Sequence, residues 1–272
     1  MKIDTHIHLY DPATKLSWPQ PGTPLYRKVS ASDFLTVGEK HNFSKAVVVE
    51  CATEIENNMH MLETSQEEEA VLAVIAYIDM KSPEFTQIYD RYSQFSKFRG
   101  LRYRYNSSDG CTDDVRKNIA YLSGKRANII ELHGSYQELI QLSELVLENP
   151  DVQFIIEHVG CIVIDGKEVP EVYINFLKRM SLFDNVCMKL SAIICLSKEV
   201  PAPTELSYYL PVLEANWNVF GDERLIFGSD WPVLELKGTY DEAVGLTEEY
   251  LRSKSLDSMD KVMYRNAMRI YS

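Results

Sequence analysis

The sequence lacks the features of a membrane or secreted protein. No apolar stretch approaches the roughly 20 residues that a membrane-spanning helix needs, and Asp4, His6 and His8 interrupt the amino-terminal region where a signal peptide would be apolar. The five cysteines are odd in number and show no C-x-x-C spacing, so no zinc knuckle or redox pair is expected. These absences predict a cytoplasmic protein without a membrane partner.

Positive charge is also scarce in this chain. Its 272 residues include 28 Lys and Arg against 40 Asp and Glu, which gives a formal net charge of −12. Nucleic acid is not an expected partner, because phosphate binding requires a basic face. A small-molecule partner remains compatible, since a few local charges bind it. Whether the chain forms a homo-oligomer stays open.

Short apolar, β-branched segments recur along the chain and alternate with amphipathic helical patterns. We predict strands at 2–7, 45–51, 71–78, 98–104, 128–132, 152–157, 185–190 and 224–228. Helices are predicted at 54–66, 83–95, 113–122, 135–148, 170–182, 205–218, 240–252 and 257–271, with Ser135 as a helix N-cap. Nearly continuous apolar runs are typical of parallel strands that are covered on both faces.

Eight such strands in a chain of this length predict one α/β domain over residues 1–272, a (β/α)8 TIM barrel. A doubly wound open sheet is the alternative. It is less favoured, because no Gly-rich phosphate loop follows any of the predicted strands. The long segment 10–32, rich in proline and aromatic residues, would lie on the functional face of the barrel.

Polar residues gather at the carboxyl ends of the predicted strands, which in a barrel meet at one mouth. In chain order they are His6 and His8, Glu50, Asp79, Arg102 and Arg104, His133, Glu157 and His158, Lys189, and Asp230. Each one alone has a structural explanation, such as packing, a turn or a surface ion pair. Together, on so many strands, they favour an active site.

Three of these features are the most informative. His6 and His8 stand two apart, so in a strand they point to the same face and could bind one metal ion or one substrate oxygen. Lys189 lies within an apolar strand, and Asp230 directly follows one. A charge in such a place needs a partner or a wet cavity.

Several segments, in this order, resemble the amidohydrolase superfamily, specifically the amidohydrolase-related (amidohydrolase 2) branch that contains lactonases of sugar and dicarboxylic acids. They are IDTHIHLYDP, VVVECATEIENNMHML, AYIDM, RGLRY, FIIEHVG, MKLSAI, RLIFGSDWPV and YRNAMRIY. The resemblance covers essentially the whole chain. It implies a (β/α)8 barrel and a hydrolase that opens a lactone.

The resemblance also implies roles for individual residues. Asp230 would take a proton from the attacking water, with His158 and Lys189 as further catalytic residues. Substrate contacts would come from Arg102, Glu50, Trp231 and Asp79. A carboxylate with an ordinary pKa is a weak base, so Asp230 would need either a raised pKa or a water made acidic by a metal. The substrate would be anionic or polyhydroxylated.

The resemblance leaves the metal open. Many relatives work without one and carry an apolar residue where His133 stands, whereas zinc-dependent relatives use a histidine there. His6, His8, His133 and Asp230 would then hold one divalent metal, zinc in the first place, with metal-independent catalysis as the alternative. Glu50 stands where the branch usually has Gln, and its negative charge suits a cation.

Two competing functions follow. A zinc-dependent non-oxidative decarboxylase of a hydroxylated aromatic acid would use the same fold. A non-catalytic protein that binds a small molecule on a barrel scaffold is the third hypothesis, but it has no need of a general base beside a histidine cluster.

Overall fold

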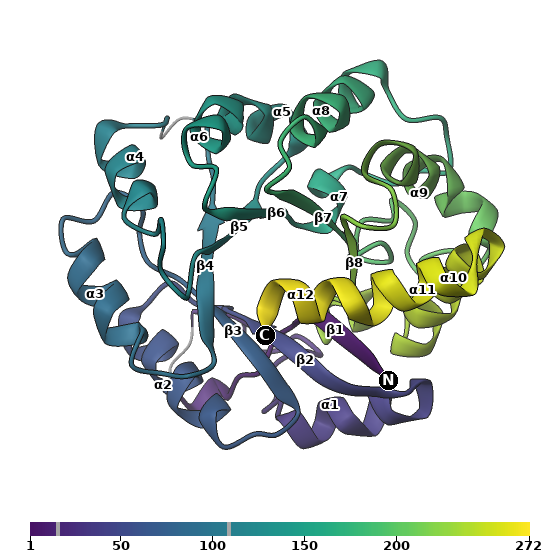
Figure 1. The fold of residues 1–272 in the computed structure, drawn as a ribbon. Helices are drawn as coiled ribbons and strands as arrows, with labels where there is room; N and C mark the ends of the chain where they lie inside the picture. Colours follow the sequence, from purple (N-terminus) through teal and green to yellow (C-terminus); the bar gives the residue numbers. More distant parts are fainter. Residues whose placement is uncertain (15–16, 108–109) are drawn as a thin grey trace.

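The computed structural model describes residues 1–14, 17–107 and 110–272, and it confirms the predicted barrel. Eight parallel strands follow one another around the sheet in chain order (Figure 1). They are β1 (Lys2–Ile7), β2 (Phe43–Val49), β3 (Val71–Ala76), β4 (Phe98–Arg104), β5 (Ile129–His133), β6 (Gln153–Ile156), β7 (Val186–Ser191) and β8 (Leu225–Gly228). All eight predicted strands are present, with ends shifted by a few residues at most.

The barrel closes where β8 meets β1. Asp230 N donates a hydrogen bond of 2.9 Å to His6 O, and His8 N donates one of 2.9 Å to Trp231 O. Ile7 and Trp231 form a parallel bridge. The first and last strands are therefore joined by the same backbone segments that carry His6, His8 and Asp230.

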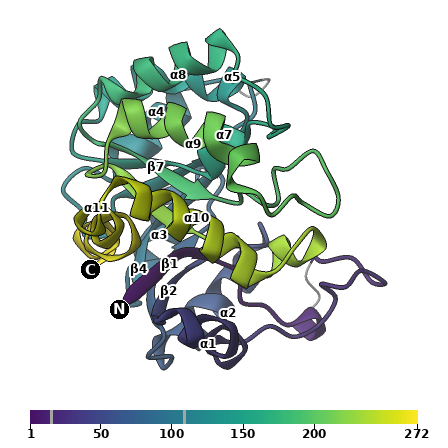
Figure 2. The same ribbon diagram turned by 90° about the vertical axis from the view of Figure 1, so that its right-hand side faces the viewer.

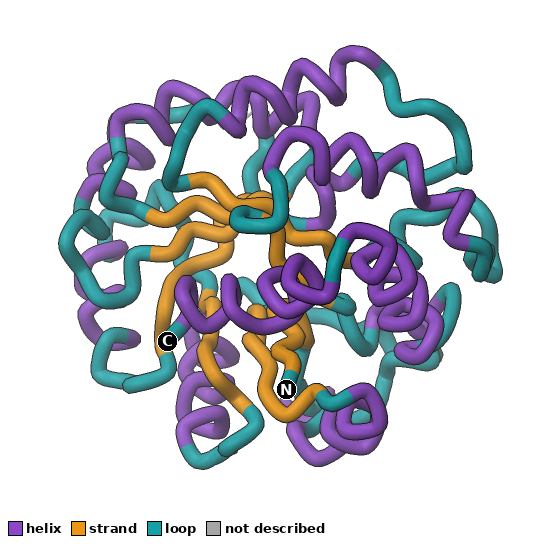
Figure 3. Tube along the Cα trace, turned by 45° about the vertical axis from the view of Figure 1, so that its right-hand side comes forward, coloured by secondary structure: helices purple, strands orange, loops and turns teal. Residues whose placement is uncertain are grey.

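Helices surround the strands on the outside (Figures 2 and 3). They are α1 (Ala31–Gly38), α2 (Ile55–Gln66), α3 (Phe85–Tyr92), α4 (Asp113–Ala120), α5 (Tyr136–Leu139), α6 (Ser143–Glu148), α7 (His158–Cys161), α8 (Glu171–Ser181), α9 (Leu206–Phe220), α10 (Tyr240–Lys254), α11 (Leu256–Asp260) and α12 (Asn266–Tyr271). Short 3-10 turns are η1 (Pro12–Thr14), η2 (Glu39–His41), η3 (Ile140–Leu142) and η4 (Val233–Leu236), and η5 (Lys261–Arg265) is a π-helical turn. None of the described helices is long and apolar enough to cross a membrane.

Two of the described helices were not predicted: α1 and the single turn α7. α1 begins at Ala31, within the end of the segment 10–32 that was expected to be irregular, and residues 15–16 of that segment lie outside the described residues. Its start carries a complete capping box, in which Ser30 and Asp33 bond each other's backbone N–H groups. This S-x-x-D pattern was readable in the sequence. At α5, by contrast, Ser135 occupies the predicted N-cap position, but its hydroxyl bonds Glu138 Oε2 at 2.7 Å instead of a backbone N–H.

Two apolar layers hold the fold together. The outer layer lies between the strands and the helices, and it contains most of the buried Leu, Phe and Tyr side chains. The inner layer fills the barrel with strand residues such as Ile3, Val47, Ile75 and Ile226. Tyr271 of α12 joins this inner layer, and Figure 1 shows α12 lying across one end of the barrel. The carboxyl terminus thus closes the end opposite the predicted site.

An irregularity in β1 aims its first histidine. Ile3 belongs to the inner layer, and His6 also faces the barrel interior, although side chains three apart in a regular strand point to opposite faces. The β1–β2 register shifts between Asp4 and Ile7, as a bulge does, and this resolves the conflict. Gly228 leaves room for the histidine, because a Cβ there would lie 2.8 Å from His6 Cβ.

Candidate active site

A cluster of histidines surrounds one carboxylate at the carboxyl ends of β1 and β8. His8 Nε2 lies 3.3 Å from Asp230 Oδ1, and His6 Nε2 lies 3.6 Å from the same oxygen. One ligand-type atom from each of His6, His158 and Asp230 lies within 4.8 Å of the others. These side chains are almost completely buried, so the cluster is held in place by its surroundings.

Two members of the cluster have unusual backbones. Asp230 has φ 66° and His158 has φ 52°, both in the left-handed region that non-glycine residues rarely occupy. Such conformations persist where neighbouring contacts impose them, and they concentrate at functional sites. For His158 the contact is Ser191 at the end of β7, whose Oγ lies 3.1 Å from the His158 backbone N and 2.9 Å from its Nδ1.

A second carboxylate connects the remaining predicted residues. Glu157 Oε2 accepts hydrogen bonds from Arg102 Nη2 at 2.7 Å and Nε at 3.0 Å, and it lies 3.0 Å from His133 Nδ1. Its other oxygen, Oε1, lies 3.8 Å from His6 Nδ1. Glu157 therefore links Arg102 and His133 on one side to His6 on the other.

Lys189 has its partner inside the barrel. Its ammonium donates to Glu131 Oε2 at 2.5 Å and to Thr5 O at 2.7 Å, and it lies 3.3 Å from His6 Nδ1. The Tyr271 hydroxyl donates to the second oxygen of Glu131 at 2.6 Å. Lys189 and Glu131 form a fully buried ion pair directly beneath His6. Glu131 is therefore the partner that the charge of Lys189 was expected to need.

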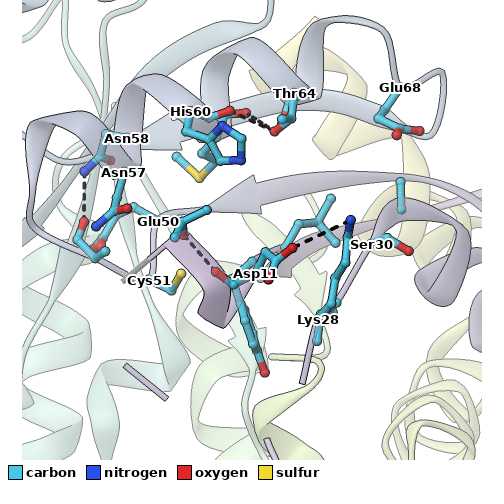
Figure 4. Close-up of a pocket in the computed structure, with 18 residues that line it drawn as sticks. Asp11, Lys28, Ser30, Glu50, Cys51, Asn57, Asn58, His60, Thr64 and Glu68 are labelled. Atoms are coloured by element: carbon cyan, nitrogen blue, oxygen red, sulfur yellow. Dashed lines mark hydrogen bonds and ion pairs between the residues drawn. The ribbon is translucent and has the colours of Figure 1, made fainter. Parts of the chain in front are cut away.

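Glu50 and Arg104 form an ion pair at the rim. Arg104 Nε lies 2.8 Å from Glu50 Oε1, and Arg104 Nη2 lies 2.7 Å from Oε2. A cavity of about 420 Å³ opens beside Glu50, between α2 and the segments after β1 and β2. Figure 4 shows Glu50 on its wall, with Lys28 and Asp11 paired across it. The described members of the histidine cluster, which are His6, His8, His158 and Asp230, do not line this cavity.

Burial dominates the electrostatics of the cluster. It lowers the pKa of His158 to about 4, and it lowers that of His6 well below its usual value, with help from Lys189. Both imidazoles are therefore neutral at pH 7. For Asp230, burial acts to raise the pKa, but His158 and His8 outweigh it, and the pKa is lowered. The surroundings of Asp230 therefore do not supply the raised pKa that one route to a competent base requires.

Two predicted residues lie away from the cluster. Asp79 is exposed, three residues beyond β3, and its carboxylate accepts a hydrogen bond of 2.9 Å from Lys81 N. Trp231 is 2% exposed and packs against Phe34, while its indole N–H donates to Glu235 Oε1 at 2.8 Å. A substrate contact by either side chain stays a prediction.

The cluster fits a divalent metal ion by its chemistry and its geometry. Two imidazoles and a carboxylate are ligands that Zn²⁺ accepts, and tetrahedral bonds of about 2.1 Å place neighbouring ligand atoms about 3.4 Å apart. His6 Nε2 is buried without a hydrogen-bond partner, and so is Glu157 Oε1. If a metal were bound to His6 Nε2, the Nδ1–H of the same ring would face Glu157 Oε1. The second ring nitrogen of a metal-bound histidine usually donates to a carboxylate or carbonyl oxygen in this way.

This grouping differs from the ligand set expected from the sequence. His158 lies with His6 and Asp230, whereas His133 groups with Glu157 and His158. His8 Nε2 lies near Asp230 Oδ1, but His8 belongs to none of these groups of three. A metal at the described cluster would therefore be held by His6, His158 and Asp230, with His8 beside the carboxylate.

Four contributors were not singled out from the sequence: Glu131, Glu157 as a linker, Ser191 and Tyr271. Glu131 had a usable signal, because a carboxylate within the apolar run NIIEL poses the same problem as Lys189 does in its strand. Ser191 and Tyr271 had none, since each matters only through a residue far away in the chain.

Comparison with known proteins agrees with this architecture. The family model for amidohydrolases matches residues 3–272. An L-fucono-1,5-lactonase from Burkholderia ambifaria is 25% identical over 250 residues, covering 88% of this chain and 83% of that protein.

Solved structures show the same fold at lower identity. An amidohydrolase from Burkholderia multivorans with bound zinc is 20% identical and superposes with a TM-score of 0.87 over 100% of this chain and 99% of that one. A probable 2-pyrone-4,6-dicarboxylic acid hydrolase from Acinetobacter baumannii with bound citric acid is 20% identical, with a TM-score of 0.79 over 99% and 98%. The chain belongs to the amidohydrolase family and is a hydrolase, as its sequence motifs indicated.

Proposed function

We propose that this hydrolase opens a lactone, with Asp230 as the base that takes a proton from the attacking water. The observation that carries the proposal is the buried Asp230 carboxylate, 3.3 Å from His8 Nε2 and 3.6 Å from His6 Nε2 at the mouth of the barrel. The lactonase named among its relatives, and the pyrone hydrolase among the similar folds, support the same reaction class.

The proton transfers balance within this site. Water loses a proton to Asp230 as its oxygen bonds to the lactone carbonyl carbon, and the carbonyl oxygen becomes an oxyanion. Fixed donors must stabilise that charge, and Arg102 is a guanidinium beside the cluster, with Nη2 3.2 Å from His133 Nδ1. When the ring C–O bond breaks, Asp230 returns the proton to the leaving alkoxide, which stays tethered in the product.

We further propose that His6, His158 and Asp230 hold one divalent metal, zinc in the first place. When bound, such an ion supplies Lewis acidity and makes a water acidic near pH 7. The lowered pKa of Asp230 makes this contribution useful, because the carboxylate alone is a weak base. Lys189 acts through His6 as a positioning residue, from within the barrel.

A pH-indicator assay over a panel of aldonolactones and dicarboxylic lactones tests the proposal, because ring opening releases an acid. Each substrate is assayed on the protein as purified, after chelation, and after zinc is restored. Acid release that chelation abolishes and zinc restores supports both proposals, whereas release that survives chelation removes the metal and keeps the lactonase. Silence across the panel, with carbon dioxide released from a hydroxylated aromatic acid, would establish the decarboxylase instead.

A further inference from the structure

We infer that Glu50 is a specificity-determining residue, which occupies the Arg104 guanidinium and so selects an uncharged, polyhydroxylated lactone against one that carries a free carboxylate. The choice of a lactone as substrate rests on the proposed function. The way in which Glu50 selects among lactones rests on the geometry of the Glu50–Arg104 pair. The inference assigns a role to Arg104, which projects from the mouth of the barrel.

The pair has the geometry in which an arginine recognises a carboxylate. Two parallel hydrogen bonds join Nε to Oε1 at 2.8 Å and Nη2 to Oε2 at 2.7 Å, so one edge of the Arg104 fork is filled. The Glu50 side chain is 1% exposed, while that of Arg104 is 37% exposed. The guanidinium thus reaches the open mouth, but its Nε–Nη2 edge is filled and its charge is balanced by a carboxylate of the protein.

A substrate carboxylate cannot displace Glu50 without a large penalty. Glu50 follows β2 and is buried, so release of Arg104 would leave an ionised carboxylate with fewer partners in a desolvated place. Arg102 offers only a weaker contact, with Nη1 3.6 Å from Glu50 Oε1. The pair is therefore stable against a competing anion from solution.

The other cations near the cluster are occupied as well. Arg102 pairs with Glu157 at 2.7 Å, and Lys189 pairs with Glu131 at 2.5 Å. Apart from its imidazoles, the charged side chains described at the site are three cations and four carboxylates: Arg102, Arg104 and Lys189 against Glu50, Glu131, Glu157 and Asp230. Each guanidinium among them is already paired with a carboxylate, so an added carboxylate meets no cation whose charge is unbalanced.

Hydroxyl groups face no such obstacle. Arg104 retains N–H donors that Glu50 does not use, and a neutral hydroxyl or ring oxygen accepts a single hydrogen bond without displacing an anion. The rim thus distinguishes substrates by charge, and the sugar-type lactone is the class that fits it.

The test is the isosteric substitution Glu50→Gln, with succinate as the probe. Isothermal titration calorimetry measures succinate binding to the unmodified protein, to Glu50→Gln, and to the double variant Glu50→Gln/Arg104→Gln. We expect Glu50→Gln to bind succinate at least tenfold more tightly than the unmodified protein, and the double variant to lose that gain. Glu214→Gln is the matched control. Glu214 of α9 pairs with Lys254 of α10 at 2.6 Å, far from the mouth, so this substitution also removes a carboxylate from an ion pair.

Equal succinate affinity in the unmodified protein and in Glu50→Gln would overturn the inference. If Glu50→Gln does not fold, the unmodified protein still tests the inference. An equal kcat/KM for a carboxylated lactone and for its uncharged counterpart would also overturn the inference. Because succinate binding needs no turnover, a protein that opens no lactone would refute the proposed function while the titration still decides the role of Glu50.

Discussion

The Tyr271 hydroxyl donates a hydrogen bond of 2.6 Å to Glu131 Oε1 in the centre of the barrel, 140 residues away in the chain. Glu131 in turn bonds Lys189, which lies 3.3 Å from His6 Nδ1. Tyr271 of α12 thereby supports a histidine at the opposite end of the barrel.

Tyr271→Phe should destabilise the protein, because it keeps the ring but leaves Glu131 Oε1 buried without this donor. The expected loss is about 1–3 kcal/mol in the free energy of unfolding, measured by urea denaturation. Tyr26→Phe is the control, since Tyr26 is 45% exposed. A Tyr271→Phe protein as stable as the control would show that the hydroxyl contributes nothing.

Asp230→Asn should abolish ring opening while the fold remains intact. The amide keeps the shape of the side chain but cannot accept a proton, and general-base catalysis typically contributes about 10²–10⁴-fold to the rate. We expect kcat to fall by at least about 100-fold, with an unchanged circular dichroism spectrum. Asp114→Asn, on the exposed start of α4, serves for comparison. Retained turnover in Asp230→Asn would exclude it as the base.

Zinc affinity should depend more on His6 and His158 than on His133. His133 Nδ1 is engaged by Glu157 and Arg102, whereas His6 Nε2 has no hydrogen-bond partner. Competition with a chromophoric chelator should show zinc affinity lowered by more than about tenfold in His6→Asn and His158→Asn. His60→Asn, an exposed site on α2, controls for unspecific binding. A larger loss in His133→Asn would instead favour the ligand set expected from the sequence.

Asp4 should make stability depend on pH in an unusual direction. Burial raises its pKa to about 6, against hydrogen bonds from Ser229, His6 and Tyr240 that lower it. Between pH 4 and pH 6 the folded state therefore holds more protons than the unfolded state, and stability falls as the pH rises through this window.

Asp4→Asn removes this titration. From pH 4 to pH 7.5 the unmodified protein should lose about 2 kcal/mol of unfolding free energy relative to Asp4→Asn, which is most of the effect of a shift from 3.8 to about 6. Urea denaturation at both pH values measures the difference. A difference that does not change with pH would show that Asp4 titrates normally.

Gly228→Ala should be strongly unfavourable, because the added Cβ would lie 2.8 Å from His6 Cβ and 3.1 Å from Ser191 Cβ. Overpacking of this kind typically costs about 1–3 kcal/mol, and here it would also displace His6. Gly245→Ala is the matched control. No atom lies within 4 Å of a Cβ at Gly245, which is inside α10, and the change should stabilise by roughly 0.5–1 kcal/mol. Thermal unfolding should separate the two, and equal melting temperatures would contradict the role of Gly228.

Much of the fold was predictable because its signals are local. Apolar runs with β-branched residues marked every strand, and polar residues at the strand ends marked the mouth of the barrel. Of the two missed helices, α1 had a local signal in Ser30 and Asp33 as well. The family motifs added the order of the strands, and with it the expectation that His6 and Asp230 meet.

The sequence by itself therefore determined the barrel, the end of it that carries the chemistry, and the residue types available there. Only the tertiary structure decided which of them pair. That choice depends on the bulge in β1, the left-handed backbones at His158 and Asp230, and the closure of β8 onto β1. A shift of one residue in a strand turns a side chain to the other face, so no local pattern could have placed Glu157 beside His133, or Tyr271 beneath Glu131.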